Sequence, residues 1–370
     1  MIVAAIVGTR PEAIKMAPVI RALRGRGCKV RVVLTGQHSN LVNNLLHSLG
    51  IAESVNLHAL REGQTLSQLL ASLVAKLDQE FADSATDIVL VQGDTSSALA
   101  GALVAFNRKI PVGHIEAGLR SGSIENPFPE EMNRTVIATL AAMHFAPTDG
   151  AKKNLLQEGV RDGDIWITGN TVIDNLYWSN NQALGKSAFQ AGERGRKVLL
   201  TMHRRENQGE VMVRVAEMLR RLSSDMRLSV VLPIHPSPAV QEALLPVLSS
   251  APNVRIVEPL EYLDFIATLA DCDFVLTDSG GVQEEAPALN KPVLILRTTT
   301  ERPEGVDSGC AELVGIDPPA IEQAIRSLVN DSAKYLRMAN SQNPYGAGQA
   351  SQIICDVLSE HFPAARRDRY

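Results

Sequence analysis

Short apolar, β-branched runs alternate along this chain with longer amphipathic segments. Strands are expected at 2–7, 30–34, 88–91, 112–115, 144–147, 165–168, 198–201, 229–232, 254–256, 274–277 and 293–296. Runs of this kind have the length of buried strands, whereas the longer segments between them have the periodicity of helices that cover a sheet. The alternation predicts the α/β class, with parallel sheets flanked by helices.

The expected strands fall into two sets, separated by a polar stretch over 174–196 that should hold a helix and a loop. A chain of 370 residues, 45% of them hydrophobic, is long enough for about two domains. We place the boundary at Gly169, which predicts a first domain over 1–169 and a second over 170–348. A last helical pattern, within 349–370, is expected to pack back on the first domain.

Composition excludes several classes of protein. The net charge of -5 and the 4% aromatic content argue against nonspecific nucleic-acid binding and base-stacking platforms. The four cysteines (Cys28, Cys272, Cys310 and Cys355) form no close pair, which disfavours a metal site or a disulfide framework and fits a reducing compartment. The apolar segment 1–7 is too short for a membrane span and lacks a basic flank. These features predict a cytoplasmic enzyme without a nucleic-acid or membrane partner.

A nucleotide site is predicted where the strand at 274–277 ends and the next helix begins. Free backbone N–H groups and the helix dipole at Ser279, Gly280 and Gly281 favour an anion such as a phosphate. The two glycines allow close backbone approach, and Glu285 is suited to accept hydrogen bonds from two sugar hydroxyls. A glycine-rich turn that only joins a strand to a helix would have the same sequence.

A companion segment follows the strand at 198–201. His203, Arg204 and Arg205 supply hydrogen-bond donors at the carboxyl end of that strand, where α/β domains bind ligands. The two segments together favour a nucleotide site over a glycine-rich turn that only joins a strand to a helix.

The first half of the chain repeats this design. Arg10 and Lys15 lie near a helix start that follows the first strand, with Thr9 as the expected cap and Pro11 in the first turn. Asp94 follows the strand at 88–91 in the same way. A helix cap with solvated charges is the alternative interpretation of both segments.

Three carboxylates of this half are expected to converge. Asp94 and Glu116 each follow an apolar strand, and Glu130 begins a helix together with Glu131. Acids at a helix start are also favoured by the dipole alone. Carboxylates that crowd together raise one another's pKa, so that one can hold a proton while another is ionised. Such a set is suited to moving protons.

Taken together and in order, these motifs resemble the non-hydrolysing UDP-N-acetylglucosamine 2-epimerases. The resemblance implies two Rossmann-like domains in a GT-B arrangement, with the active site in the interdomain cleft and a homodimer as the usual assembly. It also implies a UDP-sugar substrate, no NAD, no essential metal, and a product that feeds surface polysaccharide synthesis. The motifs are Gly8-Thr9-Arg10-Pro11-Glu12, Gln92-Gly93-Asp94-Thr95, Glu116-Ala117-Gly118-Leu119-Arg120, Pro129-Glu130-Glu131-Met132-Asn133-Arg134, Gly169-Asn170-Thr171, His203-Arg204-Arg205-Glu206, Asp278-Ser279-Gly280-Gly281 and Glu301-Arg302-Pro303-Glu304.

The resemblance also implies roles for single residues. Residues matched to catalysis or to the leaving diphosphate are Arg10, Lys15, Asp94, Glu116, Glu130 and His203. Residues matched to UDP binding are Arg10, Lys15, His203, Phe265, Ser279, Gly280, Gly281, Glu285 and Arg302. The implied reaction eliminates UDP to give 2-acetamidoglucal and adds it back, which inverts C2.

Several positions depart from the family pattern. A regulatory UDP-N-acetylglucosamine site of many members maps near Gln37, Asn40, Gly63, Glu130, Arg204 and His235. Asn40 stands where a longer Gln is common, and Gly63 where an Arg is common, so a multidentate donor is lost. The sequence therefore predicts weak or absent activation by substrate.

Three alternatives share part of this pattern. A hydrolysing epimerase would release N-acetylmannosamine and UDP. A retaining glycosyltransferase would need an acceptor, and the three carboxylates argue against it. A non-catalytic nucleotide-sugar sensor would be expected to lose some of Asp94, Glu116, Glu130 or His203, and all four are present.

Overall fold

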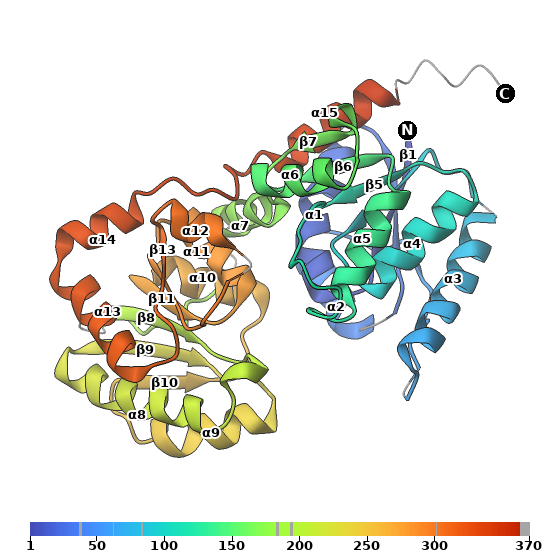
Figure 1. The fold of residues 1–370 in the computed structure, drawn as a ribbon. Helices are drawn as coiled ribbons and strands as arrows, with labels where there is room; N and C mark the ends of the chain where they lie inside the picture. Colours follow the sequence, from blue (N-terminus) through green and yellow to red (C-terminus); the bar gives the residue numbers. More distant parts are fainter. Residues whose placement is uncertain are drawn as a thin grey trace. The chain divides into compact units, whose positions relative to one another are not determined.

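The computed structural model describes residues 1–36, 39–61, 63–82, 84–182, 185–192, 195–300 and 302–362, with only the backbone described for 39–41. The chain divides into two compact units (Figure 1). Unit 1 comprises Met1–Asn175 and the segment from Tyr345 on, and unit 2 comprises Leu176–Pro344. Each unit is built around its own parallel sheet.

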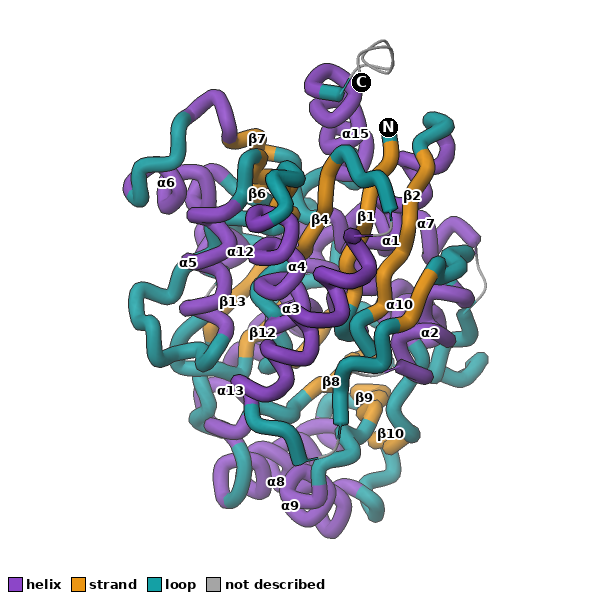
Figure 2. The backbone as a smooth tube through the Cα atoms, turned by 90° about the vertical axis from the view of Figure 1, so that its right-hand side faces the viewer, coloured by secondary structure: helices purple, strands orange, loops and turns teal. Residues whose placement is uncertain are grey.

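The sheet of unit 1 has the strand order β3-β2-β1-β4-β5-β6-β7, and every pairing is parallel. Figure 2 shows β2, β1 and β4 side by side in this sheet. Its strands are β1 (Ile2–Val7), β2 (Lys29–Leu34), β3 (Val55–Asn56), β4 (Ile88–Gln92), β5 (Val112–Ile115), β6 (Met143–Ala146) and β7 (Ile165–Ile167). Its helices are α1 (Arg10–Gly25), α2 (Ser39–Ser48), α3 (Leu66–Ala82), α4 (Ser96–Asn107), α5 (Glu130–Leu140), α6 (Asp149–Gln157), η1 (Asp162–Asp164) and α15 (Ala350–His361), and α7 (Thr171–Gln182) runs from unit 1 into unit 2.

The core of unit 1 follows from sequence periodicity. Buried Met16, Val19, Ile20 and Leu23 recur at helical spacing and form one face of α1. Small residues bring α4 close to the sheet: a Cβ added at Gly101 would lie 3.0 Å from Cγ1 of Ile6. These contacts place the amino-terminal ends of α1 and α4 at the carboxyl edge of the sheet.

The sheet of unit 2 has the order β10-β9-β8-β11-β12-β13 and is also parallel throughout. Its strands are β8 (Arg196–Thr201), β9 (Leu228–Pro233), β10 (Val254–Val257), β11 (Phe274–Thr277), β12 (Val293–Ile295) and β13 (Ala311–Leu313). Its helical segments are η2 (Arg205–Asn207), α8 (Glu210–Asp225), α9 (Pro238–Leu248), α10 (Tyr262–Asp271), α11 (Gly280–Ala288), α12 (Pro303–Asp307), α13 (Pro318–Asn330) and α14 (Ser332–Ala339). The buried stripe Met212, Val215, Ala216, Leu219 and Leu222 packs α8 against this sheet.

The predicted fold class is confirmed. Each expected strand is present, with ends that differ by at most two residues. Two strands were missed, β3 and β13, because both are very short and neither contains a run of β-branched residues. Among the described residues, each helix is too short or too polar to cross a bilayer.

The segment from Tyr345 on returns to unit 1, where α15 packs on α1 (Figure 1). Asp174 of α7 accepts hydrogen bonds from the backbone N–H of Ala350 (3.2 Å) and of Ser351 (2.8 Å), at the start of α15. Arg26 contacts Asp356 of α15 at 2.6 Å. The end of the predicted 349–370 segment lies outside the described residues after 362.

Candidate active site

A buried carboxylate ties together two loops at the carboxyl edge of the unit 1 sheet. Glu12 is 1% exposed and accepts hydrogen bonds from the backbone N–H of Gly8 (2.9 Å) and Thr9 (2.6 Å). Its other oxygen accepts the hydroxyl of Thr95 at 2.7 Å. Burial raises the pKa of Glu12 to about 7, against the opposing effect of these hydrogen bonds. The loop that carries Arg10 is thereby joined to the loop that carries Asp94.

Gly8 is required by the close approach of these loops. A Cβ at this position would lie 2.1 Å from Oγ of Ser97 and 2.8 Å from Oγ1 of Thr35. Those two hydroxyls are hydrogen-bonded to each other at 2.8 Å, so they cannot both move aside without losing that bond.

Glu116 lies directly after β5 and is held by donors from three other segments. Its backbone has φ +65, a left-handed conformation that is uncommon outside glycine. The carboxylate accepts hydrogen bonds from Nζ of Lys15, Nε2 of Gln92 and Nδ2 of Asn170, the last at 2.9 Å. One cation and two amides thus fix the position of the Glu116 carboxylate.

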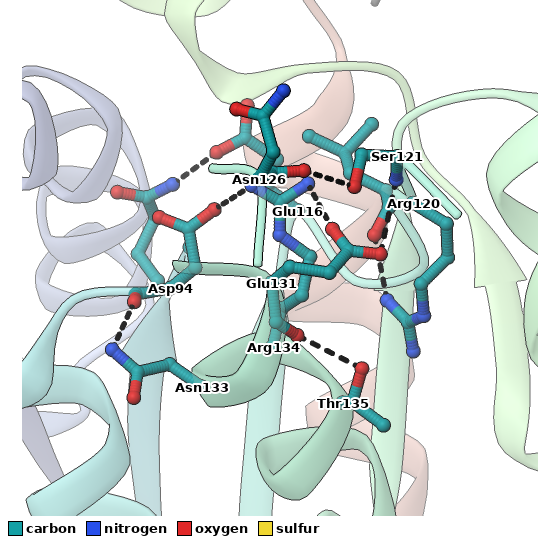
Figure 3. Close-up of polar contacts among 12 residues, drawn as sticks. Asp94, Glu116, Arg120, Ser121, Asn126, Glu131, Asn133, Arg134 and Thr135 are labelled. Carbon is teal, nitrogen blue, oxygen red and sulfur yellow. Dashed lines mark hydrogen bonds and ion pairs between the residues drawn. The ribbon is translucent and has the colours of Figure 1, made fainter. Parts of the chain in front are cut away.

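Asp94 lies beside Glu116 and Glu130 in one electrostatic cluster. The pKa of Asp94 is raised chiefly by burial, and also by the charges of Glu116 and Glu130. The cations Arg134 and Lys15 oppose this rise. Figure 3 shows Arg134 reaching Asp94, with a distance of 2.6 Å between Nη2 and Oδ2. Asp94 therefore lies between two carboxylates that raise its pKa and two cations that lower it.

His114 of β5 contacts the loop that carries Asp94. It is fully buried, and its Nε2 lies 2.7 Å from the carbonyl oxygen of Gly93, directly before Asp94. Burial lowers the pKa of His114 to about 3, so the ring is neutral at physiological pH. A neutral imidazole that donates to this carbonyl fixes the turn in which Asp94 lies.

A second buried carboxylate organises the carboxyl edge of the unit 2 sheet. Asp278 has no exposed surface and accepts hydrogen bonds from the backbone N–H of His203 (2.9 Å) and of Arg204 (2.8 Å), and from Nδ2 of Asn207 (3.0 Å). Nδ1 of His203 lies 3.3 Å from the same carboxylate. The loop after β8 is thereby joined to the loop after β11.

The imidazole of His203 is also packed against a second ring. Its centroid lies 5.3 Å from that of His235, and the two rings are stacked. Burial is the main cause that lowers the pKa of His203, while the Asp278 carboxylate opposes it and His235 and Arg204 reinforce it. Asp278 thus orients the His203 ring through Nδ1. With the Nδ1 proton on this side the neutral ring presents Nε2 as an acceptor, and the ring donates to a ligand from Nε2 when it is protonated.

The predicted anion site lies where β11 ends and α11 begins, as expected, but the N–H of Ser279 is not free, contrary to the prediction. Ser279 caps the helix, and its N–H donates to Oγ1 of Thr277 at 2.9 Å. The guanidinium of Arg302 covers Gly280, where a Cβ would lie 2.6 Å from Nη1. Arg302 is held there by Glu284. Glycine is thus needed at 280 for the cation to approach the helix start.

Glu285 and Phe265 belong to two helices of unit 2. Glu285 of α11 is 7% exposed, and its Oε1 lies 3.4 Å from the hydroxyl of Tyr262. Phe265 is half-buried on α10, one turn after Tyr262. The structure thus joins Lys15, Asp94, Glu116 and Glu130 in one cluster within unit 1. Within unit 2 it places Arg302 over Gly280 and Glu285 beside Tyr262.

The predicted regulatory residues are only partly described. Gln37 lies outside the described residues, as does Glu301 of the last motif, and of Asn40 only the backbone in α2 is described. Gly63 has φ +76 and open space around its Cβ position. An Arg at this position would fit sterically but would need a strained backbone.

Comparisons with known proteins agree on one family. The profile described as UDP-N-acetylglucosamine 2-epimerase matches residues 21–359. The UDP-N-acetylglucosamine 2-epimerase of Bacillus subtilis is 43% identical over 359 residues, which cover 96% of this chain and 94% of the relative. That of Salmonella typhimurium is 39% identical, with 98% of this chain and 99% of the relative covered.

Solved structures show the same likeness. A UDP-GlcNAc 2-epimerase from Neisseria meningitidis, bound to UDP-GlcNAc, superposes with a TM-score of 0.89 at 40% identity and covers 97% of this chain and 100% of its own. An epimerase from Methanocaldococcus jannaschii, in complex with UDP-GlcNAc and UDP, gives 0.82 at 33% identity with the same coverage. A glycotransferase of kitacinnamycin, at 14% identity and a TM-score of 0.66, shares the fold alone.

Proposed function

Because this chain belongs to the UDP-N-acetylglucosamine 2-epimerase family, we propose that it interconverts UDP-N-acetylglucosamine and UDP-N-acetylmannosamine without hydrolysis. The observation that carries this proposal is the cluster formed by Asp94, Glu116 and Glu130. In this cluster Lys15 contacts Glu116 and Arg134 contacts Asp94. Proton removal and proton return on opposite faces of one carbon require at least two such groups.

The chemistry explains why the reaction needs elimination. C2 of an N-acetylhexosamine carries no directly attached carbonyl, so simple deprotonation there faces a very high barrier. When a carboxylate removes the C2 proton while the C1–O bond to UDP breaks, the electron pair forms the C1–C2 double bond of 2-acetamidoglucal. Return of a proton to the opposite face of C2, with addition of UDP at C1, gives the epimer.

We assign proton transfer to the carboxylates and stabilisation of the leaving diphosphate to the cations and hydrogen-bond donors. Asp94, Glu116 and Glu130 exchange protons with the sugar, and the position of the Glu116 carboxylate is fixed by Lys15, Gln92 and Asn170. The cations and donors that stabilise charge on the leaving diphosphate are Arg10, Lys15, His203 and Arg302.

UDP binding is assigned to unit 2. The backbone at Gly280 and Gly281 supplies N–H groups for phosphate, beside Ser279, whose own N–H donates to Thr277. Glu285 accepts the ribose hydroxyls, and Phe265 packs beside the base. A homodimer, a cytoplasmic location and a role in surface polysaccharide synthesis belong to the same proposal and rest on the family resemblance.

Product analysis tests the proposal against its alternatives. The protein is incubated with UDP-N-acetylglucosamine alone and the mixture is followed by proton NMR. We expect UDP-N-acetylmannosamine at equilibrium with the substrate and no free sugar. Free N-acetylmannosamine with UDP would indicate a hydrolysing epimerase, and binding without conversion would indicate a sensor.

A further inference from the structure

Arg134 of α5 makes two contacts that involve the proposed chemistry (Figure 3). Its Nη2 lies 2.6 Å from Oδ2 of Asp94, and its Nη1 lies 3.3 Å from Oε2 of Glu131. The Arg134 side chain is 13% exposed, and that of Glu131 is 5% exposed. One guanidinium thus bridges two carboxylates that are largely shielded from water.

The rest of α5 holds this bridge in place. The other oxygen of Glu131 accepts the backbone N–H of Ser121 at 3.0 Å. Asn133 donates from Nδ2 to the carbonyl oxygen of Asp94 at 2.8 Å. Asp94 is therefore fixed by α5 through its main chain and its carboxylate, while Glu131 restrains the guanidinium.

We propose that Arg134 is a positioning residue for the epimerisation, which holds the Asp94 carboxylate in a single orientation and favours its ionised form. The inference rests on the proposed function, in which Asp94 exchanges a proton with the sugar. Glu131 acts on Asp94 indirectly, because it contacts Arg134 and accepts the backbone N–H of Ser121.

The charges around Asp94 show why this cation matters. Those that act on it are Arg134 and Glu130 of α5, Lys15 of α1 and Glu116 after β5. Burial and the two glutamates raise the pKa of Asp94, and Arg134 is the largest opposing influence. Without Arg134, Asp94 would bind a proton more tightly and would be a poorer acceptor at neutral pH.

Arginine suits this position better than lysine. A guanidinium presents a planar fork of N–H donors and can contact two carboxylates at once, whereas an ammonium is a compact point charge. Arg134→Lys is therefore expected to keep part of the charge effect and to lose the bridge to Glu131.

Titration of Asp94 tests the inference without relying on turnover. The carboxyl carbons of aspartate are labelled with ¹³C, and the Asp94 signal is assigned by its absence in Asp94→Asn. We expect Arg134→Met to raise the pKa of Asp94 by about 1 or more, and Arg134→Lys by less. Arg161→Met is the matched control, because Arg161 forms an exposed pair with Asp164 at 2.7 Å in the same unit.

The pH dependence of epimerisation gives the second measurement. The limb of the profile that depends on Asp94 should move to higher pH in Arg134→Met, and kcat should fall about 10-fold or more at neutral pH. In the Asp94→Asn background, Arg134→Met should change kcat less than about 3-fold, since coupled residues are not additive.

The possible outcomes are distinguishable. An unchanged pKa of Asp94 in folded Arg134→Met would overturn the inference, whatever the activity. If that variant does not fold, an unchanged pKa in Arg134→Lys together with full kcat would overturn it as well. If Arg134→Met raises the pKa of Asp94 as expected but the wild-type protein does not epimerise its substrate, the proposed function is refuted and the inference about Arg134 and Asp94 stands.

Discussion

The two units use the same device at the same place in their sheets. In each, a buried carboxylate joins the loops that follow two neighbouring strands, β1 and β4 in unit 1 and β8 and β11 in unit 2. Glu12 lies in the first turn of α1, directly after the first loop of its pair, whereas Asp278 belongs to the second loop. These strands lie where the strand order reverses, the position at which open α/β sheets bind ligands.

The neighbours of these two carboxylates differ. The donors to Glu12 that the structure describes are neutral: two backbone N–H groups and the hydroxyls of Thr95 and Thr9. Asp278 also faces the imidazole of His203. The carboxylate that joins the loops is thus separate from the proton-transfer groups in unit 1, but orients a titratable donor in unit 2. One fold position supports two kinds of chemistry through a few side chains.

The largest expected effect concerns the carboxylates of unit 1. Asp94→Asn, Glu116→Gln and Glu130→Gln should each lower kcat by about 10²–10⁴-fold, because each removes a proton-transfer group. UDP affinity should change little, since UDP binding is assigned to unit 2. Turnover and calorimetry with UDP check this division, with the exposed Glu125→Gln as control. Full activity in any of the three would remove that residue from the mechanism.

The next effect concerns the stability of unit 1. The pKa of Glu12 is raised from 4.5 to about 7, so the folded state binds a proton more tightly than the unfolded chain. Stability from this group is therefore fully present below about pH 4.5 and is lost as the pH rises to about 7. The shift corresponds to on the order of 3 kcal/mol.

Glu12→Gln should abolish this dependence while keeping the acceptor for Gly8 and Thr9. Urea unfolding of both proteins between pH 4.5 and 7.5, roughly the window of the shift, checks it. The difference in unfolding free energy, variant minus wild type, should grow with pH. A difference that stays constant over this window would mean that Glu12 titrates alike in both states.

A smaller effect is expected for the nucleotide site of unit 2. Glu285→Ala should weaken UDP binding by about 1.5–3 kcal/mol, because buried ribose hydroxyls lose a charged acceptor. Isothermal calorimetry measures this, and Glu242→Ala on the exposed side of α9 serves as control. Unchanged UDP affinity would count against the role of Glu285.

The smallest effect concerns regulation. Because Gly63 and Asn40 lack the polar reach of the usual residues, activation by UDP-N-acetylglucosamine should be weak or absent. The reaction is started from pure UDP-N-acetylmannosamine and followed for a lag. A clear lag that added UDP-N-acetylglucosamine removes would show that other side chains rebuild the regulatory site.

The fold was predictable because its central strands are buried on both faces. Continuous β-branched runs such as those of β1 and β4 are readable without a partner, whereas the two-residue β3 depends on its neighbour β2 for its conformation.

The placement of candidate side chains at the carboxyl edges of the sheets was predictable where they follow strands within two residues, as Asp94, Glu116 and Ser279 do. Contacts between side chains of different segments were not predictable from the sequence. Glu12 contacts Thr95, and Arg134 contacts Asp94, only because the fold brings their segments together. The sequence also could not separate Glu130 from Glu131, since both begin α5. In the structure Glu131 pairs with Arg134, whereas Glu130 raises the pKa of Asp94.

The central claim, that carboxylates invert C2 through elimination and readdition, is tested most directly by epimerisation in heavy water. UDP-N-acetylglucosamine is converted in deuterated buffer, and the product is analysed by proton NMR and mass spectrometry. We predict that solvent deuterium occupies C2 of the UDP-N-acetylmannosamine formed. Retention of the original hydrogen at C2 would indicate internal hydride transfer and would contradict the roles of Asp94, Glu116 and Glu130.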